Sequence, residues 1–291
     1  MSRHILAGVD GTPQSEAAAF WAAEEAERRG TALLIVHVWP WLGTGDVDAF
    51  WPGDLRPAAL RALTDIERRI RDARPGLAVE TALVGDDPAD GLVSVARGHE
   101  LLVLGSRGLS GFAGLLVGSV GLSVAARADV PVVMVRAAKP AGAEEAGHGE
   151  PEVVVGLDLR HPAEEVLDLA FEEAELRGAR LRAVHGWDLV PAWSATGWMA
   201  PQVDTAEQEA SRKAALAEAL APWRAKYPDT AVVEEVRLGG AAQAVLTHSA
   251  GAALVVVGRR DRPLGLGARL GSVAHAVLHH AQAAVAVVSH A

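Results

Sequence analysis

The sequence contains no cysteine, and aromatic residues make up only 4% of its 291 residues. The absence of cysteine excludes disulfide bonds and thiolate chemistry. No apolar run approaches the roughly 18 residues that a membrane-spanning helix needs. The opening stretch "MSRHILAGVDGTP" has too short an apolar run for a signal peptide. We therefore expect a cytoplasmic protein with no membrane partner.

Positive charge is also scarce, because 27 Lys and Arg residues stand against 37 Asp and Glu residues, for a net charge of −10. Binding to a phosphate backbone needs a net basic face, so nucleic acid is not expected as a partner. Apolar residues make up 50% of the chain, which is enough for a substantial core. The length alone suggests about two domains.

The chain contains two copies of one sequence unit. The stretch Arg3–Trp39 aligns with Glu152–Trp187, and "VGSVGLSVAARADVPVVMV" aligns with "LGSVAHAVLHHAQAAVAVV" further along each half. The period is about 150 residues, the size of one domain. We therefore predict a first domain over 1–138 and a second over 152–291. Residues 139–151, rich in Pro, Gly, Ala and Glu, are the predicted linker.

Short β-branched runs alternate with longer segments of helical period in each half. In the first half the predicted strands are Ile5–Val9, Leu33–Val38, Ala78–Val84, Leu101–Leu104 and Val130–Val135. The predicted helices between them are Pro13–Arg29, Pro57–Ala73, Pro88–Arg97 and Ser119–Ala126. Continuous apolar strands indicate burial on both faces. This pattern predicts an α/β fold of two tandem doubly wound, Rossmann-like domains, each a five-stranded parallel sheet flanked by helices.

A glycine-rich stretch, "GSRGLSGFAGLLVGSVG", follows the fourth predicted strand of the first half. Ligands of such folds bind beyond the carboxyl ends of the strands. Gly105 would let the backbone approach a ligand closely, and Gly118 with Ser119 opens a helix, Ser119 being the predicted N-cap. A helix N-terminus attracts phosphate through its amides and dipole. The spacing fits neither a Walker A loop nor the G-x-G-x-x-G fingerprint.

The spacing of Gly105, Gly108, Gly118 and Ser119 resembles the ATP-binding motif of the universal stress protein family. The stretches "GVDGT", "VHVW" and "GSVGLSVAARADVPVVMV" are also similar to that family, in both halves of the chain. The resemblance implies ATP as ligand, with Mg²⁺ as a companion ion. It implies the following contacts: Asp10 on the adenosine side, the Val38 backbone at the adenine, Gly105 at the ribose, and Gly108, Gly118, Ser119 and Val120 around the phosphates.

The second half keeps part of this pattern. Gly258, Gly271, Ser272 and Val273 match the loop, and Asp158 matches the acidic residue after the first strand. Asp261 stands where the second glycine belongs, and Gly186 replaces the valine. An aspartate beside a triphosphate opposes binding, although four nearby arginines or Mg²⁺ could offset its charge, and whether this half binds nucleotide stays open. Those arginines are Arg259, Arg260, Arg262 and Arg269.

Several polar and aromatic residues also have a purely structural interpretation that involves no ligand. Asp10 and Asp158 are candidate helix caps as well as ligand contacts, with Thr12 and His161 as competing caps. His37 and His185 are expected to be satisfied core residues. The histidines of "HAVLHH", at 275, 279 and 280, are expected to serve packing, since no third metal ligand accompanies them. The tryptophan clusters either cover the adenine, form a partner surface, or fill the core; they are Trp39, Trp41, Trp51, Trp187, Trp193 and Trp198.

The sequence thus predicts an ATP-binding stress-response regulatory protein, with no assigned catalytic residue and no metal site. One alternative is a slow ATPase or autokinase, in which Asp10 would hold Mg²⁺ or a water and Arg107 would clamp the charge. Another is an interaction module that binds no nucleotide. The apolar edge strands "VPVVMV" and "AAVAVV" are expected to pair within the chain, giving a pseudo-two-fold molecule that could also form a homodimer.

Overall fold

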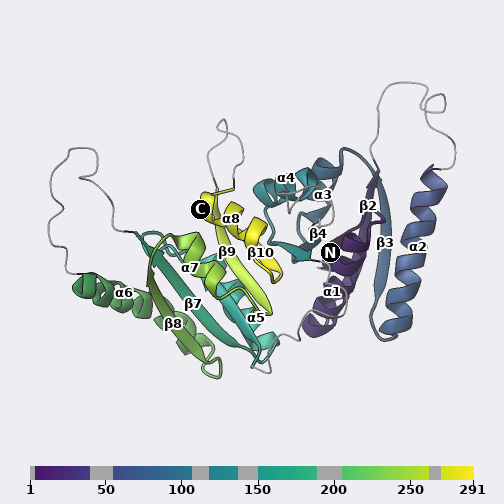
Figure 1. Cartoon of the computed structure of the whole chain (residues 1–291). Coiled ribbons are helices and arrows are strands. Elements are labelled where there is room, and N and C mark those ends of the chain that lie inside the picture. Colours follow the sequence, from purple (N-terminus) through teal and green to yellow (C-terminus); the bar gives the residue numbers. More distant parts are fainter. Residues whose placement is uncertain (1–3, 40–54, 107–117, 137–149, 189–204, 262–269) are drawn as a thin grey trace, which may run out of the picture. The chain divides into compact units, whose positions relative to one another are not determined.

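The computed structural model describes residues 4–39, 55–106, 118–136, 150–188, 205–261 and 270–291. Strands and helices alternate along both halves (Figure 1). The first half contains β1 (His4–Gly8), α1 (Pro13–Arg29), β2 (Ala32–Trp39), α2 (Leu55–Ala73), β3 (Val79–Gly85), α3 (Pro88–Ala96), β4 (Leu101–Ser106), α4 (Ser119–Arg127) and β5 (Val132–Arg136). The second half contains β6 (Glu152–Gly156), α5 (Glu164–Leu176), β7 (Arg180–Trp187), α6 (Thr205–Lys226), β8 (Val232–Leu238), α7 (Ala241–Thr247), β9 (Leu254–Arg260), α8 (Ser272–His280) and β10 (Val285–His290).

The first of two compact units consists of Met1–Glu145, Asp261–Leu270 and Ala284–Ser289. Its strands follow the order β3-β2-β1-β4-β5, and all four pairings are parallel, which confirms the predicted parallel sheet of the first half. Apolar side chains of β1 and β4 are buried on both faces of the sheet, and α1 packs on these two strands. Strand β10 adds to this unit by running antiparallel to β5, with Ala286 opposite Val133.

The second unit consists of Ala146–Arg260, Gly271–Ala283 and His290–Ala291. Its strands follow the order β9-β6-β7-β8, and all three pairings are parallel. The buried valines of β6 and β9 form its centre, with Phe171 of α5 as the largest fully buried side chain. The doubly wound architecture predicted from the alternation of elements is therefore present in both halves.

Local sequence explains where α1 begins and ends. Thr12 is its N-cap and accepts a hydrogen bond from Ser15 N–H at 3.3 Å, and Pro13 occupies the first helical position. Gly30 ends the helix in the left-handed conformation, with φ of 63°. The placement predicted for Pro13 in a first helical turn is confirmed, and Pro88 likewise opens α3 behind the N-cap Asp87.

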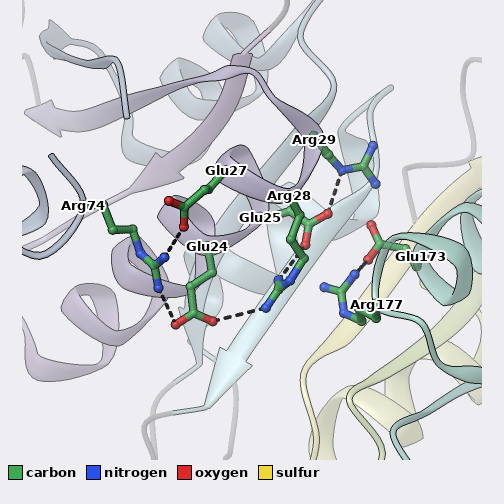
Figure 2. A network of polar contacts seen from close by, with 8 residues as sticks. All are labelled: Glu24, Glu25, Glu27, Arg28, Arg29, Arg74, Glu173 and Arg177. Atoms are coloured by element: carbon green, nitrogen blue, oxygen red, sulfur yellow. Dashed lines mark hydrogen bonds and ion pairs between the residues drawn. The ribbon is translucent and has the colours of Figure 1, made fainter. Parts of the chain in front are cut away.

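A buried ion pair repeats at the same place in both halves. Glu25 of α1, which has no exposed surface, accepts from Arg29 Nε at 2.6 Å, one helical turn later. Glu173 of α5 pairs with Arg177 at the same spacing, and Figure 2 shows both pairs. A buried carboxylate requires such a partner. The repeat seen in the sequence thus extends to individual buried contacts.

Candidate functional site

The candidate site of the first half lies at the carboxyl ends of β1, β2, β4 and β5. The register places Gly8 opposite Val36 of β2 on one side and Leu104 of β4 on the other. Residues that follow these positions therefore share one edge of the sheet. The predicted residues Asp10, Val38 and Gly105 all lie there.

Asp10 is exposed and shapes the turn between β1 and α1. Its Oδ1 accepts from Thr12 N–H at 3.1 Å and from the Thr12 hydroxyl at 2.6 Å. Its own N–H donates to Ser15 Oγ at 3.2 Å. The helix cap is Thr12, so the interpretation of Asp10 as the cap of α1 is wrong. Asp10 instead holds Thr12, the capping residue, in place through its two hydrogen bonds.

The backbone direction at Val38 follows from three hydrogen bonds. Leu33 N–H donates to Ala78 O at 2.9 Å and Trp39 O accepts from Asp86 N–H at 2.9 Å, so odd-numbered residues of β2 face β3. Val36 O accepts from Val9 N–H at 2.9 Å, on the opposite side. Because successive residues of a strand alternate, the N–H and C=O of Val38 face the β1 side. Strand β1 ends at Gly8, before it reaches the level of Val38.

Gly105 is required by packing against α1. A Cβ on this residue would lie 2.5 Å from Gln14 O and 2.7 Å from Ser15 N, both backbone atoms of the first turn of α1. The glycine therefore lets the N-terminus of α1 reach the carboxyl end of β4. From the sequence, Gly105 was expected to let the backbone approach a ligand; in the structure it lets the backbone of α1 approach β4.

At the N-terminus of α4, Gly118 is half-buried and Ser119 is exposed, and Val120 is 36% exposed. Gly118 is the N-cap and Ser119 is the first helical residue, so the prediction that Ser119 caps this helix is wrong. Within the described part of the chain, no side chain bonds to the amides of this first turn as a cap. Arg107 and Gly108 lie outside the described residues.

Two residues that no sequence pattern indicated, Ser106 and Arg136, also lie at this edge. Ser106 is 2% exposed, and its hydroxyl donates to Val135 O at 3.0 Å. Arg136 stands opposite Ser106 in the pairing of β4 with β5. Burial lowers the pKa of Arg136. A guanidinium remains charged in proteins, so Arg136 adds a cation at the carboxyl end of β5, next to the end of β4.

The second half differs at the acidic residue. Asp158 Oδ1 accepts from Arg160 N–H at 3.1 Å and from Arg160 Nε at 3.2 Å, and Arg260 lies 3.8 Å from Oδ2. Burial alone would raise the pKa of Asp158, but the hydrogen bonds and charge of Arg160, with a smaller contribution from His161, hold it below its usual value. The cap of α5 is Ala163, so neither Asp158 nor His161 caps that helix.

The remaining predicted residues of the second half are placed as follows. Gly186 leaves room for α7, because a Cβ added at this position would lie 2.5 Å from the Cα of Ala241. A Cβ added at Gly258 would lie 2.9 Å from the His290 ring. Asp261 accepts from the Ser289 hydroxyl at 2.6 Å.

Around these residues, Arg259 is 5% exposed. Gly271 is the N-cap of α8, and Ser272 and Val273 begin that helix. Arg262 and Arg269 lie outside the described residues.

Both strand-end histidines are hydrogen-bonded, as expected, but only His185 is buried and His37 is half-buried. His37 Nδ1 lies 2.8 Å from Val9 O, and His185 Nδ1 lies 2.9 Å from Leu157 O. In α8, the rings of His275 and His279 lie 4.5 Å apart. No cluster of three or more residues suited to a metal occurs within the described ranges.

Two of the tryptophans lie in described strands. Trp187 is 5% exposed and packs under Arg212, whose guanidinium carbon lies 4.1 Å from the ring centre, whereas Trp39 is half-buried at the end of β2. The tryptophans at 41, 51, 193 and 198 lie outside the described residues. No helix in the described ranges combines the length and the apolar character needed to cross a membrane.

Comparison with known proteins agrees with the architecture. The family model described as "Universal stress protein family" matches residues 1–136 and 151–289. A universal stress protein of Mycobacterium tuberculosis is 33% identical over 268 residues, covering 89% of this chain and 87% of that protein. One of Mycolicibacterium smegmatis is 32% identical over 278 residues, with coverage of 89% and 87%.

A solved universal stress protein structure from Archaeoglobus fulgidus has the same fold, with a TM-score of 0.71 and 18% identity over 99% of each chain. Two matches to one family model, each spanning a half of the chain, explain why the sequence repeats and why a glycine-rich stretch precedes a short helix in both halves. The chain belongs to the universal stress protein family, as a tandem member with one copy of the family's domain in each half.

Proposed function

We propose that the first half binds ATP at the carboxyl edge of its sheet and that the protein acts as a nucleotide-dependent stress-response regulator. The observation that carries this proposal is the backbone direction at Val38. Its N–H and C=O face the β1 side of β2, at a level beyond the end of β1. A paired donor and acceptor of this kind matches the Watson–Crick edge of adenine, which offers N1 as acceptor and the amino group as donor.

The phosphates would lie against the other end of the edge. The first turn of α4 supplies amides and the positive end of the helix dipole. Gly118, Ser119 and Val120 would hold the phosphates there, together with Gly108 of the loop. Arg136 adds positive charge on the neighbouring strand. Mg²⁺ would accompany the triphosphate, with Asp10 as its predicted carboxylate ligand.

The second half is proposed to bind ATP weakly or not at all. Arginines of the same half pair with both carboxylate oxygens of Asp158. If Asp158 turned toward a nucleotide, it would lose these partners and its charge would be unpaired. Asp261 adds a carboxylate where the first half has Gly108, and like charge disfavours phosphate. One equivalent of ATP per chain is the expected stoichiometry.

We also propose that residues 1–138 and 152–291 are the two folding domains, joined by 139–151. The pairing of β10 with β5 covers the edge of β5 that would otherwise invite another strand. A homodimer of whole chains would therefore use a different surface. Light scattering coupled to gel filtration would test this. The variant Val133→Pro disrupts β5, and it should not dissociate a homodimer that forms through another surface.

The test of the nucleotide site is to purify the protein without added nucleotide, denature it with acid and quantify what is released. Gly118→Asp places a carboxylate in the phosphate position, yet aspartate is a favoured N-cap and the φ of −70° at Gly118 suits it, so α4 should still form. Gly271→Asp is the matched control at the N-cap of α8, where an added Cβ meets no atom of the described residues within 4 Å.

The expected result is about one equivalent of ATP per chain, lost in Gly118→Asp and kept in Gly271→Asp. Two equivalents, with each variant losing one, would show that the second half also binds. If nothing is released and Mg²⁺-ATP does not bind in a titration either, the proposal is wrong and an interaction module without nucleotide is the better account.

A further inference from the structure

His37 makes a hydrogen bond whose position in the sheet has a consequence for the nucleotide site. Its Nδ1 lies 2.8 Å from Val9 O. A carbonyl oxygen can only accept, so Nδ1 carries the hydrogen in this contact. The imidazole of β2 is thereby tied to the last residue before Asp10, at the point where β1 turns into α1.

The Val9 carbonyl is the acceptor that a continuing strand would use next. In a parallel ladder, a residue that donates its N–H to one neighbour accepts from the residue two positions further along that neighbour. Val9 N–H donates to Val36 O at 2.9 Å, so the regular partner of Val9 O is the N–H of Val38. His37 supplies that carbonyl with a donor from its side chain.

The second half repeats this arrangement atom for atom. Leu157 N–H donates to Val184 O at 3.0 Å, and His185 Nδ1 lies 2.9 Å from Leu157 O. The residue in the place of Val38 is Gly186. The histidine contact therefore persists across the repeat, although the neighbouring side chain has changed from valine to glycine.

We propose that His37 is a positioning residue that occupies the Val9 carbonyl, stops the β1–β2 ladder one bond early, and so leaves the Val38 backbone to read adenine. This inference rests on the proposed function for its ligand. Adenine presents an acceptor and a donor to the N–H and C=O of Val38, whereas hypoxanthine presents a donor and an acceptor in the reverse order. His37 thus contributes to base selectivity without touching the base.

The experiment compares ATP with ITP by titration calorimetry for the wild type, His37→Ala, His37→Asn and His185→Ala. Without the imidazole, Val38 N–H can close onto Val9 O, so His37→Ala should reduce the ratio of ATP to ITP affinity by roughly tenfold, the worth of one hydrogen bond. The amide nitrogen of asparagine reaches the position of Nδ1, so His37→Asn should restore most of the ratio. His185→Ala removes the same kind of bond from the second half and should leave the ratio unchanged.

Equal losses of ATP and ITP affinity in His37→Ala, or an unchanged ratio, would overturn the inference, because a merely structural role weakens both ligands alike. If the wild type binds neither nucleotide, the proposed function fails, and amide hydrogen exchange in the free protein decides the inference by itself. The Val38 amide should exchange at least about tenfold faster than the Val36 amide in the wild type and become protected in His37→Ala. Equal protection of the two amides in the wild type would refute it.

Discussion

Replacing Gly105 by alanine tests whether the packing between α1 and β4 has been assigned correctly. The added Cβ would lie 2.5 Å from Gln14 O, 2.6 Å from Gln14 C and 2.7 Å from Ser15 N. All three are backbone atoms of the first turn of α1, so relief requires the helix to move relative to the sheet. Overpacking of this kind costs about 1–3 kcal/mol, and we expect the upper end because no side-chain rotation can help.

The matched variant is Gly258→Ala at the equivalent strand end of the second half. Its Cβ would meet the His290 ring at 2.9 Å and Val166 Cγ2 at 3.1 Å. These atoms are the far ends of side chains rather than backbone. A small rotation relieves the contact, so the expected cost is below about 1 kcal/mol.

The assay is urea unfolding followed by far-ultraviolet circular dichroism, with thermal unfolding as a second measurement. Gly105→Ala should lower the free energy of unfolding by about 2–3 kcal/mol and the melting temperature by roughly 4–8 °C. Gly258→Ala should change the melting temperature by no more than about 3 °C. A cost for Gly258→Ala equal to or above that of Gly105→Ala would refute the reasoning.

Three further predictions follow from single contacts. Thr12→Ala removes the N-cap of α1 and should cost about 1 kcal/mol in urea unfolding, whereas Thr12→Ser should cost far less. Gly30→Ala forces a Cβ into the left-handed conformation at the end of α1 and should also cost about 1 kcal/mol. Burial alone would raise the pKa of Glu152, but hydrogen bonds from Arg182 and Arg180 lower it below its usual value. A lowered pKa means stability that is present above the unfolded-state pKa and is lost as pH falls through the folded-state value. The stability gap between the wild type and Glu152→Gln should therefore be full at pH 7 and should begin to narrow as pH falls below about 4. A gap that stays the same size from pH 7 through the whole acid range would contradict this.

The elements of the fold were predictable because they depend on local pattern. Buried strands appear as continuous apolar runs, and the predicted helix Pro13–Arg29 coincides with α1, whose first turn the proline indicates. The repeat then carried the assignment from one half to the other. Burial on both faces, which requires helices on both sides of a sheet, follows from the same runs.

The site was less predictable because its contacts join residues far apart in the sequence. The reason for glycine at 105 is the backbone of Gln14 and Ser15, which no local pattern indicates. The arginine that reaches Asp158 from β9 comes from position 260. The glycine at 186, in the place of the first half's valine, is explained by the close approach of α7 to the strand.

The histidines show the same limit. From the sequence, His37 and His185 could be assigned to the core but not to a partner, because only the register of β1 against β2 shows which carbonyl each one meets. The cap of α4 was misplaced by one residue, since serine is a better cap than glycine by propensity. The chain nevertheless places Gly118 there and leaves the first amides of the helix without a side-chain cap among the described residues.

The most direct test of the proposed nucleotide site is hydrogen–deuterium exchange of the nucleotide-free protein with and without saturating Mg²⁺-ATP. The two short helices α4 and α8 serve as site and internal control, because each follows a glycine N-cap with serine and valine. The account predicts slower exchange on ATP addition in peptides covering Ser119–Gly121 and at Val38, with no change over Ser272–Ala274. Protection confined to the second half, or no protection at either helix with ATP in excess, would contradict it.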